Sequence, residues 1–334
     1  MRRHRYELLK EQRRRSLDLR TADASYGEQR EVREFHVVAG PDRFSLIHNV
    51  EPFLEFIDAA RSIFRQRMKI QFDLRNVKHV YSDGIAAFVA HLRDRRFTHN
   101  QRFRGVNPKE GAPSKVFVEC GFYDYFHARG IPAKDTPSRT VHRVTKRRVE
   151  PAIAKAFCEN AISFTFRQVR KLRPLYEVLI ECMANTKNHA SLDEEGQYNW
   201  WLFQYCDKQT KRTHFTFVDL GVGIFESLNI RAYKRLVQAV SGRDNTDIMK
   251  DIIDGKVQSR TGKKERGKGL PLVYKHAQNS YFDVFYIVSN DVLIDLKSRS
   301  SRRLRSDFHG TMLHWELQDT QRDNDGKQLS LWER

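Results

Sequence analysis

The sequence predicts an α/β protein built from two consecutive folded units, and three observations support this fold class. From residue 35 to about residue 130, strand patterns alternate with amphipathic helical patterns, which is typical of α/β domains. From residue 150 to residue 318, a long helical pattern precedes several strands rich in aromatic and β-branched residues. The chain has 334 residues, which is enough for two domains of ordinary size.

The first unit, 35–130, is expected to begin with a strand and then to alternate helices and strands. Its first helix carries Phe53, Phe56 and Ile57 on one side. Gly84 opens the second helix. The predicted elements are a strand at 44–47, a helix at 52–67, a strand at 68–74, a helix at 84–92, a strand at 103–106 and a helix at 113–126.

The second unit, 150–318, is expected to begin near Pro151. A helical pattern covers 166–190, and Pro174 is expected to break or kink it. A polar stretch with one or two helices follows at 225–266. The remaining predicted elements are strands at 198–205 and 214–220, a helix at 270–279, and strands at 282–289, 292–296 and 311–317.

Three segments lie outside these two units. Residues 1–34 are Arg-rich and lack apolar periodicity, which predicts a disordered or loosely helical basic tail. Residues 131–149 are basic and contain two prolines, which indicates a linker, and residues 319–334 form a polar tail. The basic tail fits contact with the phosphates of nucleic acid or of a membrane, and it equally fits a plain solubilising role.

Composition limits the class of protein. Hydrophobic residues make up 40% and aromatic residues 11% of the chain, which is enough to bury cores and argues against disorder throughout. The net charge of +18 favours an anionic partner, such as nucleic acid, an acidic protein or nucleotide phosphates. A solvated basic surface explains the same charge without any partner.

The cysteines indicate a reducing compartment. All four lack CxxC pairing and do not cluster with histidine, so neither a zinc site nor a disulfide framework is expected. No apolar run approaches the roughly 20 residues that span a bilayer, and the basic N-terminus leads into no apolar signal region. We therefore expect a cytoplasmic protein without a membrane partner.

Glu181, Asn185 and His189 form a stripe along one predicted helix, because they stand four residues apart. An amide oxygen can hold a hard cation such as Mg²⁺, while a neighbouring carboxylate can orient or deprotonate an attacking hydroxyl. A solvent-exposed face with a chance Glu/Asn pair gives the same pattern.

Two glycine motifs follow. Asp219 ends a predicted strand and is followed by Gly221 and Gly223; such a carboxylate can accept a hydrogen bond from an adenine amino group. The motif Gly267-Lys268-Gly269-Leu270 directly precedes a predicted helix, whose N-terminal N–H groups could bind phosphate. Each motif alone is also a common loop signature.

Together and in this order, the three motifs resemble the N, G1 and G2 boxes of the Bergerat-fold ATPases, the superfamily of gyrase, heat-shock chaperones, mismatch-repair ATPases and histidine kinases. The segment His309-Gly310-Thr311 is similar to the terminal Gly-Thr element of that family. The resemblance covers roughly residues 150–318. It implies an α/β sandwich with helices on one face of a mixed sheet, and ATP and Mg²⁺ as ligands.

The resemblance also implies residue roles. Asn185 would ligate Mg²⁺, Asp219 would read adenine, Glu181 would be the general base, and residues 225–266 would form a mobile lid. The residues expected to contact the nucleotide are Asn185, His189, Asp219, Gly221, Gly223, Gly267, Lys268, Gly269, Leu270 and Thr311. The basic residues of the lid would pair with phosphate, or they would belong to a solvated loop; they are Arg260, Lys263, Lys264, Arg266 and the adjoining Lys268.

Two further features indicate which members of this superfamily the chain resembles most. No phosphoacceptor-histidine helix is recognisable before this unit, which argues against a standard histidine kinase. Glu181 four residues before Asn185, with His189 four after, is more similar to the anti-sigma-factor serine kinases or the hydrolytic members. In those proteins the glutamate activates a serine hydroxyl or a water.

Residues 73–85 resemble the central motif of STAS domains, which occur in anti-sigma-factor antagonists, and the match extends over about residues 35–130. In the antagonists, the residue just before the glycine is a phosphorylatable serine or threonine. Here that position holds Asp83, with Ser82 before it. One hypothesis is a silent switch with fixed negative charge; the other is that Asp83 caps the following helix.

The leading expectation is an ATP-binding, ATP-hydrolysing regulatory protein that joins a STAS-like module to the ATPase module. The nearest variant is a protein serine kinase acting on a partner. Besides ATP, the expected partner is a sigma-factor-like or other regulator, or the chain associates with itself. A non-catalytic interaction module and a nucleic-acid-associated ATPase are the alternatives from other classes.

Overall fold

The computed structural model describes residues 35–108, 111–126, 137–145, 149–166, 172–189, 198–226, 234–235, 238, 241–257 and 269–320. The chain from Phe35 onward forms one compact unit. Its helices and sheets confirm the α/β fold class. None of the helices described in these ranges is both long and apolar enough to cross a membrane.

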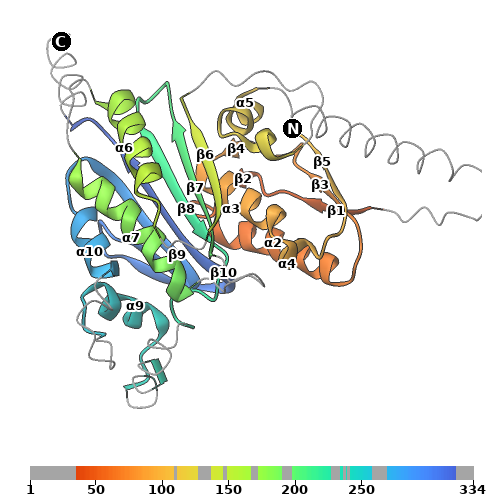
Figure 1. Cartoon of the computed structure of the whole chain (residues 1–334). Coiled ribbons are helices and arrows are strands. Elements are labelled where there is room, and N and C mark those ends of the chain that lie inside the picture. Colours follow the sequence, from red (N-terminus) through yellow and green to blue (C-terminus); the bar gives the residue numbers. More distant parts are fainter. Residues whose placement is uncertain are drawn as a thin grey trace, which may run out of the picture. The chain divides into compact units, whose positions relative to one another are not determined.

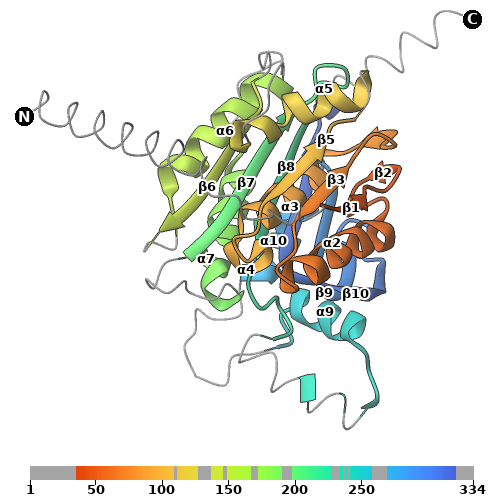
Figure 2. The same cartoon turned by 90° about the vertical axis from the view of Figure 1, so that its right-hand side faces the viewer.

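The first half contains a parallel three-stranded sheet in the order β1-β3-β5, whose strands lie side by side (Figure 2). Parallel neighbours require crossover connections, and helices provide them here. The strands are β1 (His36–Ala39), β3 (Ile70–Asp73) and β5 (Phe103–Val106), with a separate parallel pair of β2 (Arg43–Phe44) and β4 (His79–Val80). The helices are α2 (Val50–Arg65), α3 (Ser82–Arg93), α4 (Arg95–Thr98), α5 (Ala112–Glu119) and the 3-10 helix η2 (Phe122–Tyr125).

A cluster of phenylalanine rings forms the core of this half. The Phe44 ring is fully buried, and its centroid lies 5.1 Å from that of Phe53 and 5.5 Å from that of Phe88, both edge-to-face. The Phe72 ring from β3 packs edge-to-face on Phe88 from α3 at 5.0 Å. These contacts join β2, β3, α2 and α3, which explains why the amphipathic pattern of α2 could be recognised from sequence.

The second half contains a five-stranded sheet in the order β6-β7-β8-β10-β9, and every described pairing in it is antiparallel. The expectation of a mixed sheet is therefore corrected. Short connections at 207–212 and 296–300 join neighbouring strands, and such links permit only antiparallel pairing. The strands are β6 (Arg139–Thr145), β7 (Tyr198–Cys206), β8 (Thr213–Asp219), β9 (Phe282–Asp295) and β10 (Ser301–Leu317).

Both faces of this sheet are covered. On β7, Trp200 and Leu202 belong to one core, whereas Trp201 and Phe203 belong to the other, so the strand is apolar without alternation. Figure 1 shows α6 and α7 on one side of the sheet and α2 and α3 on the other. The helices of the first side are α6 (Pro151–Thr165), α7 (Arg173–His189), α9 (Asn245–Ile253) and α10 (Gly269–Ala277).

Several elements differ from their predicted form. The predicted linker 131–149 contains β6, which pairs with β7 as an edge strand. Pro174 does not kink a helix but lies in the first turn of α7, where its missing N–H costs no hydrogen bond. The two strands predicted at 282–296 are one strand, β9, and the strand predicted at 44–47 is limited to β2. Strands β1 and β4 and helix α6 were not predicted.

The division into an N-terminal and a C-terminal domain stays a prediction. Residues on both sides of the expected boundary contribute to one core, since Phe88 of α3 and Trp201 of β7 belong to the same cluster of buried residues. The guanidinium of Arg96 also donates to the carbonyl of Leu220 at 2.8 Å. The first half therefore reaches the loop that follows β8.

Candidate functional site

Glu181 and Asn185 lie one turn apart on α7, and both approach the first residue of α10. A Cβ atom at position 269 would lie 2.8 Å from Oδ1 of Asn185 and 2.8 Å from Oε2 of Glu181. Only glycine fits there without displacing these polar groups. The structure thus brings the first and third sequence motifs together at the N-terminus of α10.

The Glu181 carboxyl group lies in a partly desolvated environment. Burial raises its pKa, and the neighbouring carboxylate of Glu177 raises it further. Glu177 is itself fixed by Nε of Arg173 at 2.6 Å and by Nε2 of His276 at 2.7 Å. A carboxyl group with a raised pKa, placed beside an amide, has the character of a general base.

Asp219 ends β8 and is only 3% exposed. Burial raises the pKa of Asp219 to about 7, against the lowering effects of the Gly221 N–H and of the Arg96 charge. The Gly221 N–H donates to Oδ1 of Asp219 at 3.1 Å. A carboxyl group buried with so few donors is a strong acceptor for a ligand that brings its own N–H.

Thr311 lies directly opposite Asp219 in the β8–β10 ladder and opposite Ser289 of β9. The Ser289 hydroxyl donates to the carbonyl of Gly310 at 2.9 Å and lies 3.1 Å from Oγ1 of Thr311. Gly310 has a φ of +136°, and a Cβ there would lie 2.1 Å from the carbonyl oxygen of Asp219. Gly310 and Thr311, the terminal Gly-Thr element, therefore lie directly beside Asp219 at the end of β8.

The loop after Asp219 is held by two residues of β9 that the motifs do not include. Ser289 accepts from the Ile224 N–H at 2.9 Å, and the Asn290 side chain donates to the Val222 carbonyl at 3.0 Å. Gly223 has a φ of +78°, and a Cβ there would overlap the Asn290 side chain. The sequence signal for this pair is the polar break Ser289-Asn290 inside an otherwise apolar strand.

Cys182 connects the two parts of the site. It follows Glu181 on α7 and is fully buried; burial raises the pKa of its thiol, and the carboxylates of Glu181 and Asp219 raise it further. Helix α7, which carries Glu181, also contacts β8, the strand that Asp219 ends. The acidic strand end and the Glu/Asn face of α7 belong to one region.

The remaining predicted site residues are placed as follows. Leu270 is buried at the start of α10, and Gly221 is half-buried. His189 is the last residue of α7, and its side chain lies outside what the structure describes. Gly267, Lys268 and the basic lid residues Arg260, Lys263, Lys264 and Arg266 also lie outside the described residues. Their assignments stay predictions.

Asp83 does not cap its own helix, so that interpretation is corrected. The N-cap of α3 is Tyr81, and Asp83 lies within the first turn. Its Oδ2 atom accepts hydrogen bonds from the Leu46 N–H at 2.7 Å, the Ile47 N–H at 2.9 Å and the Ser45 hydroxyl at 2.8 Å. The carboxylate therefore caps the turn that leads into α2. The silent-switch hypothesis stays a hypothesis.

Comparisons with known proteins do not assign a function to this site. No protein-family model matches the chain. No curated protein matches it either.

Proposed function

We propose that the protein binds ATP with Mg²⁺ at the site formed by α7, the end of β8 and the start of α10, and that it hydrolyses the nucleotide. The observation that carries this proposal is the position of Gly269, whose backbone lies against the side chains of Glu181 and Asn185. Phosphate at the N-terminus of α10 would thus lie beside an amide oxygen and a carboxyl group.

Each residue would then have a separate task. The amide oxygen of Asn185 would hold Mg²⁺, which prefers oxygen ligands and bridges phosphates. Glu181, whose pKa is raised by burial, would accept a proton from the attacking water. Asp219 would accept a hydrogen bond from the adenine amino group, and the loop clamped by Ser289 and Asn290 would shape the base pocket.

A regulatory role is supported by the contact between the two halves. Arg96 of α4 donates to the carbonyl of Leu220, the residue that follows Asp219. A nucleotide at Asp219 would therefore act on a loop that the STAS-like half touches. Through this contact, binding of a nucleotide would change the surface that the first half offers to a protein partner.

Replacing the proposed general base separates binding from turnover. We expect Glu181→Gln to lower the rate of phosphate release from γ-labelled ATP by about 100-fold or more, because general-base catalysis contributes roughly that much. Binding of Mg-ATP should change little, since the amide keeps the shape and polarity of the side chain. The matched control is Glu159→Gln on the exposed face of α6, which should hydrolyse ATP like the wild type.

The same assay distinguishes hydrolysis from phosphate transfer. Incubation with labelled ATP, with and without added cell extract, yields free phosphate if water is the acceptor. Label on a polypeptide would indicate the protein serine kinase instead. Equal turnover by wild type and Glu181→Gln would remove Glu181 from the proposed mechanism.

A further inference from the structure

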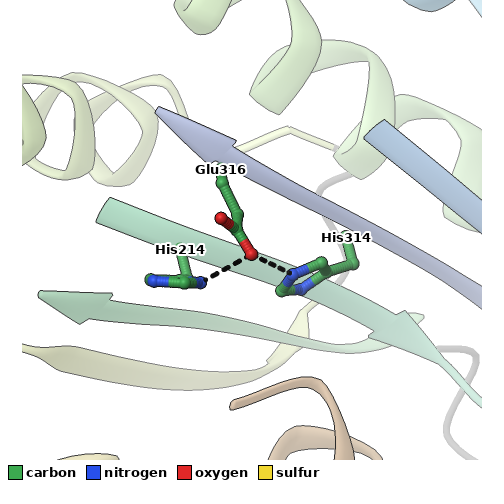
Figure 3. Close-up of side chains that lie close together, drawn as sticks. All are labelled: His214, His314 and Glu316. Atoms are coloured by element: carbon green, nitrogen blue, oxygen red, sulfur yellow. Dashed lines mark ion pairs between the residues drawn. The ribbon is translucent and has the colours of Figure 1, made fainter. Parts of the chain in front are cut away.

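A polar cluster interrupts the apolar sheet face that packs toward α2 and α3. In the β8–β10 ladder, Glu316 lies opposite His214, and His314 lies opposite Thr216. Alternate residues of a strand point to the same face, so these four side chains share one face. Figure 3 shows the two imidazole rings on either side of the Glu316 carboxylate.

The three side chains lie close enough together to hold a metal ion. Oε1 of Glu316 lies 3.1 Å from Nδ1 of His214 and 3.7 Å from Nε2 of His314. One ligand atom from each of the three residues lies within 4.8 Å of the others. Zinc binds imidazole nitrogen and carboxylate oxygen at about 2.0–2.2 Å, so an ion between them requires only slight movement of the side chains.

We propose that His214, His314 and Glu316 bind a Zn²⁺ ion on the sheet face that packs toward α2 and α3. Two histidines and one glutamate, with one position left for water or another ligand, are a donor set that zinc uses. The site is separate from the proposed nucleotide site, which uses α7, α10 and the opposite end of β8 at Asp219. It also needs none of the four cysteines, all of which are buried.

Neighbouring residues orient the proposed ligands. The hydroxyl of Thr216 lies 2.9 Å from Nδ1 of His314, which leaves Nε2 of that ring for the metal. Nη1 of Arg212 lies 3.6 Å from Oε2 of Glu316, so the other carboxylate oxygen faces the histidines. Metal sites commonly have such hydrogen-bonded outer partners, which fix ring orientation and ligand charge.

The contacts within the cluster leave one ring nitrogen without a hydrogen bond among the described residues. Nε2 of His214 is buried and has no hydrogen-bond partner among the described residues. The 3.7 Å separation of His314 from Glu316 exceeds hydrogen-bond range. Nδ1, not Nε2, is the His214 nitrogen that faces Glu316, so the unpartnered Nε2 has room for a partner of its own, such as a water, besides the proposed ion.

An adjoining cavity provides room for the fourth ligand. It has a volume of about 290 Å³, and the three proposed ligands lie in its wall. His48, Ser82 and Lys115 line it from the first half of the chain. A water molecule or a small anion in this cavity could reach the metal and complete a tetrahedral shell.

Metal titration of the tag-free full chain tests the site. After removal of metal by chelator and without nucleotide, we expect the protein to bind one equivalent of Zn²⁺ by calorimetry, and Co²⁺ to give the intense visible bands of tetrahedral coordination. His314→Ala and Glu316→Gln should weaken Zn²⁺ binding by about 100-fold. Thr216→Val should weaken it by about tenfold, because it removes only the orienting hydroxyl.

The control is His36→Ala, which removes an exposed histidine from β1 and should bind Zn²⁺ like the wild type. Circular dichroism of each metal-free variant verifies that it is folded, and Glu316→Gln keeps the shape of the side chain if His314→Ala does not fold. A wild type that binds no Zn²⁺ at micromolar concentration would overturn the proposal. Equal Zn²⁺ binding by the wild type and a folded Glu316→Gln would do the same. Neither result involves ATP, so the nucleotide site is judged separately.

Discussion

Asp219→Asn is expected to make the protein more stable at pH 8 and a weaker binder of nucleotide. Asp219 is almost fully buried, and its pKa is raised to about 7 from an ordinary value of 3.8. A difference of about three pKa units corresponds to about 4 kcal/mol in the free energy of unfolding. Asparagine has nearly the same shape and carries no charge, so it avoids most of this cost.

The way in which stability changes with pH follows from the raised pKa of Asp219. The folded protein holds the Asp219 proton more tightly than the unfolded chain, so this contribution to stability is complete below about pH 4. It is lost as the pH rises toward about 7. Melting temperatures measured from pH 4 to pH 8 should therefore fall for the wild type more than for Asp219→Asn. Affinity for nucleotide should drop about tenfold in the variant, because a charge-assisted hydrogen bond is lost.

The control for this comparison is Asp307→Asn, which changes an exposed carboxylate on β10. It should show the wild-type dependence on pH. An Asp219→Asn protein that is less stable than the wild type at pH 8 would contradict the assignment of Asp219 as a desolvated carboxyl group. Such a result would indicate that the charge is well compensated in the folded state.

Asp83→Ala is expected to destabilise the protein by about 3–5 kcal/mol. The Asp83 carboxylate accepts from two backbone N–H groups and from one hydroxyl in a buried turn. Each buried donor left without a partner costs about 1–3 kcal/mol. The turn connects β2 to α2, so its loosening would also disturb the phenylalanine core around Phe44.

Denaturant unfolding or a melting curve measures this effect. Asp58→Ala is the matched control, because Asp58 forms a partly exposed ion pair with Arg61 on α2. Such pairs contribute at most about 1 kcal/mol. If the two variants lost the same stability, Asp83 would not be the structural acceptor that its hydrogen bonds indicate. Asp83→Ser would additionally place a hydroxyl at position 83. Phosphorylation of that serine by a partner kinase would bear on the silent-switch hypothesis.

Asp83 also illustrates what the sequence could and could not predict. Its place at a helix start was recognisable, but its partners lie 36–38 residues earlier in the chain. Local patterns carry no information on which distant N–H groups a carboxylate meets. The cap interpretation was therefore wrong, although the helix itself was predicted correctly to within two residues at its start.

Among the strands, too, some could be predicted from the sequence and others could not. β3, β7 and β8 were predicted from apolar or alternating residues, many of which are buried. β5 was also predicted, although its residues are only half-buried or exposed. β6 was missed because basic residues and prolines around it suggested a linker, whereas an edge strand pairs on one side only. The antiparallel order of the sheet depends on connection lengths, which the family resemblance did not specify.

In the candidate site, spacing on one helix was enough to place Glu181 beside Asn185. Gly269 was recognisable from its motif, and the structure places it against both side chains. Ser289 and Asn290 belong to no motif, because their role is to hold backbone groups of a loop more than 60 residues away. The sequence predicted no zinc site, because the cysteines do not cluster with histidine. His214 lies about 100 residues before His314 and Glu316, and only the strand pairing brings the three residues together.

The proposed function requires Mg-ATP to bind where Asn185 meets Gly269. Calorimetric titration of ATP with and without Mg²⁺ tests it most directly, on the wild type, Asn185→Ala and the exposed control Asn76→Ala. We expect ATP binding to require Mg²⁺ in the wild type and the control. In Asn185→Ala we expect this Mg²⁺ dependence to be lost and ATP to bind at least about tenfold more weakly. Equal, Mg²⁺-independent titrations for all three proteins would contradict it.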